Sequence, residues 1–394
     1  MNFTVRLRTE FSVLLSCAVF FAAPVFADNR SSFLKICENP NKDERVTIEQ
    51  IANNVRLKYK PNICSSIYRK IQKKKKFNYA GDTIKTLSPL YYLDRLESIR
   101  TMIDEDVTEI DFSGIQNLTN LKLLSLQGTN TTAYKTNTYP EIKGLESLSS
   151  LGELKSLTLN DIGINKIDFL GALNKIEQVT INKNKIDNLE SKFLPSALIT
   201  LNLRENFIPL IPNMAHLTSL QNLDLSHNTF NDISNLSGLD SLKDFRISRA
   251  SSSKDRIKLD GLNVINTFSK LEILYIQGWN IENVDFLSGL EKIQEINLRN
   301  NKIIDVTPLN TLTSLGSLDV MRNNITDLSP LLPLSENPNF ELSGNPNPLK
   351  FCSPTNARQL RAGISCEGNF FSDIWNAGHR IYERRQHLKQ YETP

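Results

Sequence analysis

Apolar residues recur at a fixed spacing along most of this chain. In a frame of L-x-x-L-x-L-x-x-N-x-I, the second apolar position recurs every 22 residues in two runs, at Leu157, Val179, Leu201, Leu223 and Phe245, and again at Leu274, Ile296, Leu318 and Phe340. Leu124 also fits the frame, and Ile110 fits as a shortened first unit, which brings the count to eleven units. A period that is kept for more than 200 residues predicts a solenoid of stacked repeats.

Within each unit the pattern changes from alternating to irregular. Ile296 and Leu298 flank Asn297, which predicts a short strand with two inward side chains, and Ile303, Val306 and Leu309 bring the chain back to the same core. One unit cannot bury its apolar side alone, whereas stacked neighbours can. The sequence therefore predicts an α/β solenoid, a leucine-rich repeat array of about eleven units with a parallel, concave β-sheet.

Two insertions interrupt the period. The step from Leu124 to Leu157 has eleven extra residues, and the step from Phe245 to Leu274 has seven. The first insertion, residues 130–143, is polar and contains Tyr134 and Tyr139, which predicts a protruding loop. The second, residues 251–270, begins polar and then carries four apolar residues, so part of it should pack back onto the core: Ile257, Leu259, Leu262 and Ile265.

Six units have asparagine at the ninth frame position: Asn184, Asn206, Asn228, Asn301, Asn323 and Asn345. The chain turns sharply out of the strand there and leaves backbone N–H and C=O groups inside, where an amide side chain can pair with both kinds of group. We expect these residues to form a ladder. Five units have another residue at this position: Ile115, Thr129, Ile162, Ala250 and Trp279. Two of these, Thr129 and Ala250, directly precede the insertions.

Trp279 is the largest departure from the asparagine ladder. An indole N–H only donates, so it cannot replace both functions of an amide. The preceding unit has the small Ala250 at the same frame position. We therefore expect Trp279 to fill space beside the second insertion. The alternative is an indole that is turned outward to meet a ligand.

The repeats resemble those of a known family. The stretches "LTSLGSLDVMRNNITDLSPL" and "INLRNNKIIDVTPLNTL" are similar to the internalin-like leucine-rich repeats of bacterial exported proteins, over residues 107–348. The resemblance implies a helical cap ahead of the repeats and a concave face that binds a ligand, which differs among members. Cell-wall-anchored members carry a C-terminal sorting motif, which we do not find in this sequence.

Four regions follow from these patterns. Residues 1–27 have a basic start, an apolar run and Val25-Phe26-Ala27, as in a cleaved signal peptide. Residues 28–106 predict a helical N-terminal cap, with a capping box at Thr47 and Gln50 and a second helix from Asn62. Residues 107–349 hold the repeats. Residues 350–394 predict a C-terminal cap and a helical tail that docks on the last repeat, with a helix that seeks a partner or a membrane as the alternative.

Cysteine usage agrees with export. Without the signal peptide, four cysteines remain: Cys37, Cys64, Cys352 and Cys366. Eleven strands about 4.8 Å apart span on the order of 50 Å, whereas a disulfide needs Cα atoms within about 7 Å. We therefore predict Cys37–Cys64 and Cys352–Cys366, one in each cap. The sequence around Cys17 also resembles a lipoprotein box, so lipidation of Cys17 is an alternative to cleavage after Ala27. We expect no transmembrane segment in the mature chain, and an oxidising location: periplasm, cell surface or medium.

Residues beside the inward strand positions face the concave side. Most are small and polar, but the middle of the array differs. Arginine and aromatic residues are enriched at binding hot spots, which makes this middle region the candidate ligand-binding surface. Its residues are Arg246, Ile273, Tyr275, Gln277 and Arg299. The alternative is an ordinary solvated strand face.

The net charge of +3 does not indicate nucleic-acid binding. The densest basic run, residues 69–77, could bind a polyanion, but cations also suit a helix C-terminus and no aromatic residues are interleaved with them. The four histidines have no metal-like spacing, and neither a nucleophile elbow nor a P-loop is found. We expect no catalysis, metal or cofactor.

The sequence therefore predicts an exported bacterial leucine-rich repeat protein that binds a protein partner through its concave face and inserted loops. Three alternatives stay open. The first is recognition of an envelope or host glycan or polyanion, the second is a structural envelope protein without a discrete ligand, and the third is an effector that acts on host proteins.

Overall fold

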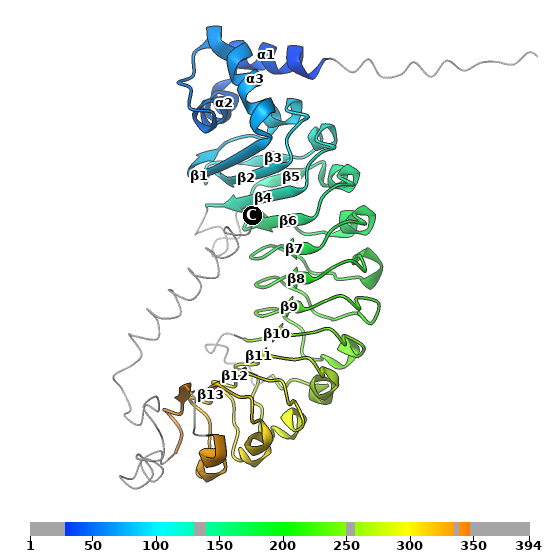
Figure 1. The fold of residues 1–394 in the computed structure, drawn as a ribbon, viewed down its shortest axis with the longest axis vertical. Helices are drawn as coiled ribbons and strands as arrows, with labels where there is room; N and C mark the ends of the chain where they lie inside the picture. Colours follow the sequence, from blue (N-terminus) through cyan, green and yellow to red (C-terminus); the bar gives the residue numbers. More distant parts are fainter. Residues whose placement is uncertain (1–27, 130–138, 250–256, 335–338, 347–394) are drawn as a thin grey trace, which may run out of the picture.

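The computed structural model describes residues 28–129, 139–249, 257–334 and 339–346. The chain forms a curved array with a helical cap at its N-terminal end (Figure 1). Strands line the inner side of the arc, and short helical turns line the outer side. The predicted leucine-rich repeat solenoid is therefore confirmed.

The N-terminal cap consists of three α-helices and one 3-10 turn. They are α1 (Asn29–Glu38), α2 (Lys42–Asn54), η1 (Pro61–Ile63) and α3 (Cys64–Lys74). Their inner faces bury Phe33, Ile48, Ile51, Ile67 and Ile71, so the cap shields the first turn of the solenoid with its own apolar core.

The prediction of a capping box at Thr47 and Gln50 is wrong. Helix α2 starts earlier, because the Asn41 side chain accepts hydrogen bonds from the backbone N–H groups of Asp43 and Glu44, and Glu44 in turn accepts from the Asn41 N–H. Thr47 lies inside the helix and is buried, and its hydroxyl donates to the Thr86 carbonyl over 2.8 Å. The local sequence does not separate the two roles, because a threonine whose buried hydroxyl bonds to a distant carbonyl can precede the same residues as a threonine N-cap.

Twelve strands form one parallel sheet in the order β1-β2-β4-β6-β7-β8-β9-β10-β11-β12-β13-β14. In each pair from β4 onward, the second apolar frame positions are register partners, for example Leu223 with Phe245 and Phe245 with Leu274. The strands are β1 (Lys76–Ile84), β2 (Ser98–Ile103), β4 (Leu123–Gly128), β6 (Ser156–Asn160), β7 (Gln178–Thr180), β8 (Thr200–Asn202), β9 (Asn222–Asp224), β10 (Asp244–Arg246), β11 (Ile273–Tyr275), β12 (Glu295–Asn297), β13 (Ser317–Asp319) and β14 (Asn339–Glu341).

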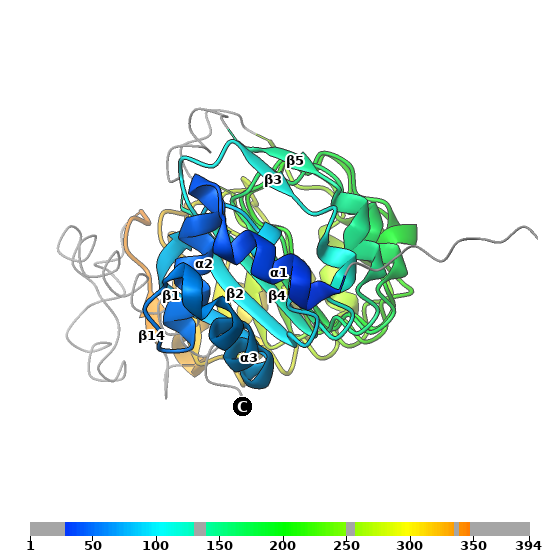
Figure 2. The ribbon, with the colours of Figure 1, turned by 90° about the horizontal axis from the view of Figure 1, so that it is seen from above.

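The sheet begins upstream of Val107, which corrects the placement of Ile110. Leu124 pairs with Ile99 in β2, and Ile99 pairs with Phe77 in β1. Ile110 lies instead in β3 (Glu109–Asp111), which pairs with β5 (Glu141–Lys143) as a second sheet. Figure 2 shows β3 and β5 on a different side of the coil from β2 and β4. Ile110 is buried, so it follows the apolar pattern while it serves another wall of the core.

Short 3-10 turns return the chain along the outer side. They bury one or two apolar residues each in most units, such as Leu170, Leu236 and Leu309. The turns are η2 (Ser88–Tyr92), η3 (Ile115–Asn117), η4 (Leu145–Ser150), η5 (Asp168–Ala172), η6 (Ser191–Phe193), η7 (Ser234–Leu236), η8 (Leu262–Thr267), η9 (Asp285–Leu287), η10 (Thr307–Thr311) and η11 (Ser329–Leu334).

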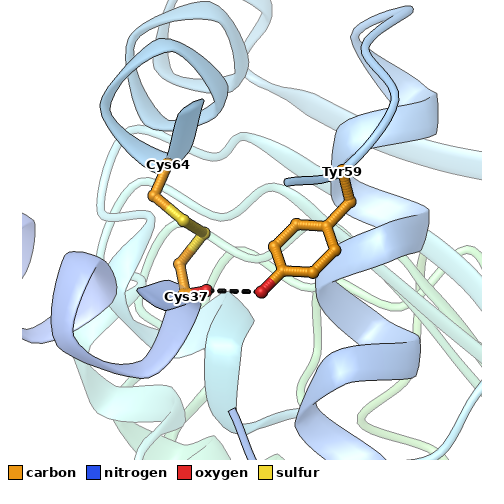
Figure 3. Close-up of a disulfide and its surroundings, with 3 residues drawn as sticks. All are labelled: Cys37, Tyr59 and Cys64. Atoms are coloured by element: carbon orange, nitrogen blue, oxygen red, sulfur yellow. Dashed lines mark hydrogen bonds between the residues drawn. A yellow bond between two sulfur atoms is a disulfide. The ribbon is translucent and has the colours of Figure 1, made fainter. Parts of the chain in front are cut away.

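The predicted Cys37–Cys64 disulfide is present and joins the end of α1 to the start of α3, with Cα atoms 5.8 Å apart (Figure 3). The Tyr59 hydroxyl donates to the Cys37 carbonyl over 2.7 Å, so the connection between α2 and α3 is held at the same point. Cys352, Cys366, the tail helix and the signal peptide lie outside the described residues.

The first insertion does not end as a protruding loop. Residues 139–143 return to the solenoid, where Glu141–Lys143 forms β5. The Tyr139 hydroxyl donates to the Lys183 carbonyl over 3.2 Å, and Lys185 lies over the Tyr139 ring. Gly163, at φ 88°, makes room for this contact, because a Cβ there would lie 2.7 Å from the Tyr139 Cβ.

The second insertion packs back onto the core, as its apolar residues predict. Leu259 and Ile265 are buried, and Ile257 and Leu262 pack against the core from its edge. The Asp260 N–H also donates to the Asn231 carbonyl over 2.8 Å, which joins the insertion to the preceding unit. Part of each insertion is therefore anchored to the solenoid.

Candidate binding surface

The asparagine ladder holds the turns that follow the strands. Its six members are at most 7% exposed. Each side-chain amide donates to a carbonyl 25 residues earlier, and each amide oxygen accepts from an N–H 20 residues earlier. In Asn206 these partners are Ile181 and Ile186, at 2.8 and 3.1 Å. Because every rung joins two units, the concave surface is a rigid stack.

Trp279 is buried, at 1% exposure, so it packs inside the turn as expected. Its ring stacks on Phe230 with centroids 5.7 Å apart, and the Arg249 guanidinium lies 4.9 Å from the indole. The indole N–H donates to the Ile247 carbonyl, and its backbone N–H donates to Asn301. The side chain therefore belongs to the core and to the ladder and is not turned out toward a ligand.

The concave face divides into two halves by charge. In β4, β6 and β7, the side chains that flank the inward positions are uncharged, and most of them are Ser, Thr, Asn or Gln. Among the described side chains, the charged residues at these positions in β1, β2 and β8 are cations: Lys76, Arg100 and Arg204. Strands β9 to β14 contribute five carboxylates and two guanidiniums: Asp224, Asp244, Glu295, Asp319, Glu341, Arg246 and Arg299. We call this second set the acidic half.

Within the acidic half, four side chains form a chain of polar contacts across β10, β11 and β12. Arg246 binds Asp244 through two hydrogen bonds of 2.7 and 2.8 Å. The Arg246 guanidinium lies 4.3 Å from the centre of the Tyr275 ring, and the Tyr275 hydroxyl donates to Glu295. The four residues are part-buried, so the chain holds an aromatic ring and a guanidinium in one orientation before any partner arrives.

The other candidate residues lie beside this chain. Ile273 is half-buried and is the register partner of both Asp244 and Glu295, so an apolar side chain sits between two carboxylates. Gln277 follows β11, and its N–H donates to the Ser248 hydroxyl. Arg299 follows β12 and contacts the Met321 sulfur over 3.4 Å. The structure thus places all five predicted residues on or beside three neighbouring strands.

A second group of charges lies at the C-terminal end of the sheet. Asp319 and Glu341 are register partners, and Asp319 is only 5% exposed. Burial raises the pKa of Asp319 to about 6, against a lowering effect of the Met321 N–H and Arg299. Burial also raises the pKa of Glu341. This end of the face therefore carries two carboxyls that burial makes easier to protonate, beside the cation Arg299.

Sequence reasoning missed the role of Asp244. The residue directly precedes the inward Phe245, so the frame alone places it on the concave face beside Ile273. Asp244 matters because it lies within hydrogen-bonding distance of Arg246. The two residues are two positions apart, so they project from the same side of one strand. A frame-based search for opposite charges at spacing two would have found the pair.

The basic run of residues 69–77 lies at the end of α3. Lys75 is the left-handed C-cap, and the Lys74 ammonium donates to the Asn54 carbonyl over 2.8 Å. Lys75 also pairs with Glu97 at 2.7 Å. These contacts favour the helix-terminus interpretation of the run, because the cations lie where the last carbonyls of a helix attract them.

Within the described ranges, no helix is long and apolar enough to cross a membrane. Across the same residues, no three His, Cys, Asp or Glu side chains are grouped as metal ligands would be.

No family model matches this sequence, and no curated protein sequence matches it either. Solved structures do match. An internalin of Listeria monocytogenes (inlF) is 20% identical, with a TM-score of 0.58 over 81% of this chain and 89% of that one. A leucine-rich repeat protein of Leptospira interrogans is 18% identical, with a TM-score of 0.46 over 75% of this chain and 74% of that one. The match to the internalin shows that the chain has an internalin-like leucine-rich repeat fold.

Proposed function

We propose that this protein is an exported, non-catalytic binding protein that recognises a protein partner through its concave face, with Arg246 and Tyr275 at the centre of the contact. The observation that carries the proposal is the Asp244–Arg246–Tyr275–Glu295 chain. It presents a stacked guanidinium and aromatic ring on a rigid sheet, and such side chains contribute most to protein interfaces because little entropy is lost when they bind.

The positions of the two insertions also favour binding through the concave face. One insertion follows β4 and the other follows β10, and described residues further along each insertion are hydrogen-bonded to the solenoid. Loops that arise from one rim of a rigid sheet can extend the area that a partner contacts. Export is supported by the signal-like N-terminus and by the Cys37–Cys64 disulfide, since structural disulfides persist in oxidising compartments.

The experiment is a capture from envelope and host-cell extracts, with the protein immobilised through its N-terminal cap. Three forms are compared: the wild type, Arg246→Ala/Tyr275→Ala, and a surface control, Arg45→Ala/Lys192→Ala. Quantitative mass spectrometry should find a protein that the wild type and the control recover equally and that the concave variant loses. A partner that all three forms recover equally would exclude the Arg246 and Tyr275 region.

Glycan recognition is the second candidate, and the uncharged side chains of β4, β6 and β7 on the concave face favour it. Side-chain hydroxyls and amides can pair with sugar hydroxyls as donors and acceptors. A glycan array separates the two functions. Binding to a defined glycan that is lost in Thr158→Val/Thr180→Val and kept in Arg246→Ala/Tyr275→Ala would favour the glycan and would move the site to the N-terminal half.

A further inference from the structure

One repeat unit presents a group of exposed apolar side chains. Phe207, Pro209 and Leu210 are exposed, and we call these three residues the apolar patch. Phe207 is 46% exposed and Leu210 is 74% exposed, and within the described chain Ile304 is the one other large apolar side chain of this kind. A single exposed apolar residue is ordinary, whereas several on one unit mark an interaction surface.

The other units show that the fold does not require this patch. In the part of the frame that reads N-x-I-x-x-L, the apolar positions are buried, as Ile208 and Ile211 are, and the three x positions face outward. In six other units the same three positions hold polar residues or glycine, with Ile304 as the one large apolar exception. The unit that begins at Asn206 therefore has apolar side chains where a solvated surface needs polar ones.

The apolar patch lies on a side wall of the coil and not on the concave sheet. Ile208 takes the place in its unit that Ile142 of β5 takes in the unit of β4, since both begin a run of apolar residues three positions apart. β5 lies on a different side of the coil from β2 and β4 (Figure 2). The array curves within the plane of Figure 1, so the side wall runs along the side of the arc, where two such walls can lie face to face.

We propose that two copies of this chain pair through the apolar patch, side wall against side wall, about a two-fold axis that crosses the wall at the Asn206 unit. In such an isologous contact, Phe207, Pro209 and Leu210 of one copy meet the same residues of the other. The inference goes beyond the proposed function, because the concave sheet of each copy stays open in the pair.

The residues next to the patch suit this pairing. The two arrays run in opposite directions about the axis, so each unit before the patch faces the unit equally far after it. One unit out, Asp187 faces Asn231 and Asn188 faces Asp232, and all four side chains are exposed. Each of these contacts joins a carboxylate to an amide, and the symmetry repeats both of them.

The pairing remains complementary further from the axis. At the middle x position, Asn165 faces Asp260 two units out. Three units out, Lys143 faces Glu282, and both are exposed. Over these units none of the three outward positions brings like charges together. Charge complementarity therefore favours a second copy as the occupant of the wall.

The same charges select one direction of pairing. If the two arrays ran in the same direction, each unit would face its own counterpart. Asp187, Asp260 and Glu282 would then each lie opposite the same carboxylate of the other copy. Like charges directly opposite each other are unfavourable, so the antiparallel arrangement is the one that the sequence of the wall supports.

The size of the contact predicts its strength. The units from three before the patch to three after it cover about 30 Å along the array, and six residues across the wall cover about 20 Å. The contact is then roughly 600 Å² per copy, at the low end of specific interfaces, so we expect a dissociation constant on the order of micromolar.

Sedimentation velocity of the mature chain tests the pairing. The wild type should change from monomer to dimer between about 1 and about 100 μM. Phe207→Ser/Leu210→Ser makes the patch polar, as in other units, and should raise the dissociation constant at least about 30-fold, because each dimer loses both side chains twice. Ile304→Ser is the matched control, since it removes an exposed apolar side chain four units away, and it should leave the dissociation constant unchanged.

A cysteine variant tests the position of the axis. Mild oxidation of Leu210→Cys should join two copies through the new thiols, because the axis brings this residue beside its own counterpart. Ile304→Cys should give no such covalent dimer, since the two copies of this residue lie about 40 Å apart across the axis. Peptide mapping identifies the joined residues.

A charge swap tests the direction of pairing. Asn231→Asp puts a carboxylate opposite Asp187 at two places in the dimer and should weaken it about fivefold. Asp187→Asn/Asn231→Asp restores a carboxylate and an amide at each place and should return the dissociation constant to that of the wild type. Circular dichroism confirms that every variant is folded.

Three outcomes would overturn the proposal. A wild type that stays monomeric up to about 100 μM would show that the apolar patch does not bind a second copy. Equal dimerisation of Phe207→Ser/Leu210→Ser and the wild type would place the contact elsewhere. A dimer in which Leu210→Cys does not cross-link, or in which the charge swap does not restore affinity, would exclude this axis.

Discussion

The indole N–H of Trp279 donates to the carbonyl of Ile247, and this carbonyl is the one that the ladder uses. Ladder asparagines donate to a carbonyl 25 residues earlier, as Asn301 does to Ile276. Trp279 reaches back 32 residues, which is the same step plus the seven inserted residues. The indole therefore keeps the donor function of the amide and loses its acceptor function, while its volume fills the turn.

Trp279→Phe should destabilise the protein by about 1–3 kcal/mol, because it leaves the buried Ile247 carbonyl without a donor. Trp279→Asn should cost more, about 3–5 kcal/mol, because the amide restores a donor but leaves most of the volume beside Phe230 empty. Chemical denaturation gives both free energies. An asparagine variant at least as stable as the phenylalanine variant would show that the hydrogen bond matters more than the volume.

Removal of one regular rung should also be costly. Asn206→Ala deletes a donor to Ile181 and Leu203 and an acceptor for Ile186, all of them buried, and should lower the free energy of unfolding by about 2–4 kcal/mol. Asn188→Ala is the matched control, since Asn188 is exposed and bonds only to Glu190 within the described chain. The control should change stability by less than about 0.5 kcal/mol. Equal effects at the two sites would contradict the ladder's structural role.

The Cys37–Cys64 bridge should stabilise the cap mainly through the unfolded chain. Its loop has a sequence separation of 27 residues, which corresponds to about 3–4 kcal/mol of closure entropy. Cys37→Ser/Cys64→Ser should lose about this amount, and a reductant should destabilise the wild type by this amount more than it destabilises the variant, which keeps the predicted Cys352–Cys366 bridge. Thiol labelling of the native protein provides the check, because labelling of both cysteines without denaturant would mean that the bridge does not form.

The buried carboxyl of Asp319 predicts a pH dependence of stability. Its folded-state pKa is about 6 and the ordinary pKa of an aspartate is 3.8, so the folded protein binds the proton more tightly than the unfolded chain. This contribution to stability is complete below the unfolded value and is lost as the pH rises through about 6. Asp319→Asn should therefore be more stable than the wild type at pH 7, by roughly 1–3 kcal/mol, with a smaller difference at pH 4. A difference that does not change with pH would contradict the assignment.

Much of the array could be predicted because its period and its packing have the same cause. Each frame leucine must reach one shared core, so the spacing from Leu124 to Phe340 translates directly into strand register. Ile110 could not be placed this way, because a three-residue strand with one inward apolar residue also fits the second sheet, and its partner Ile142 is decided by how the first insertion folds.

The sequence predicts which residues lie on the candidate surface, but it does not predict the contacts between their side chains. The frame places Arg246, Tyr275 and Gln277 on one face, since strand alternation is strict. Whether Arg246 points to a partner, to Tyr275 or to Asp244 depends on side-chain torsions that the period does not encode. The structure shows a guanidinium bound by Asp244 and stacked on Tyr275, so it enters any interface already oriented.

The affinity of a captured partner for the purified protein tests the proposed binding site most directly. Its dissociation constant is measured for the wild type, for Arg246→Ala, for Tyr275→Ala and for the control Arg45→Ala/Lys192→Ala, with circular dichroism to confirm that every variant is folded. Each concave substitution should weaken binding about 30-fold, the effect of a hot-spot loss of roughly 2 kcal/mol, and the control should not change it. Unchanged dissociation constants for both concave variants would contradict recognition through this face.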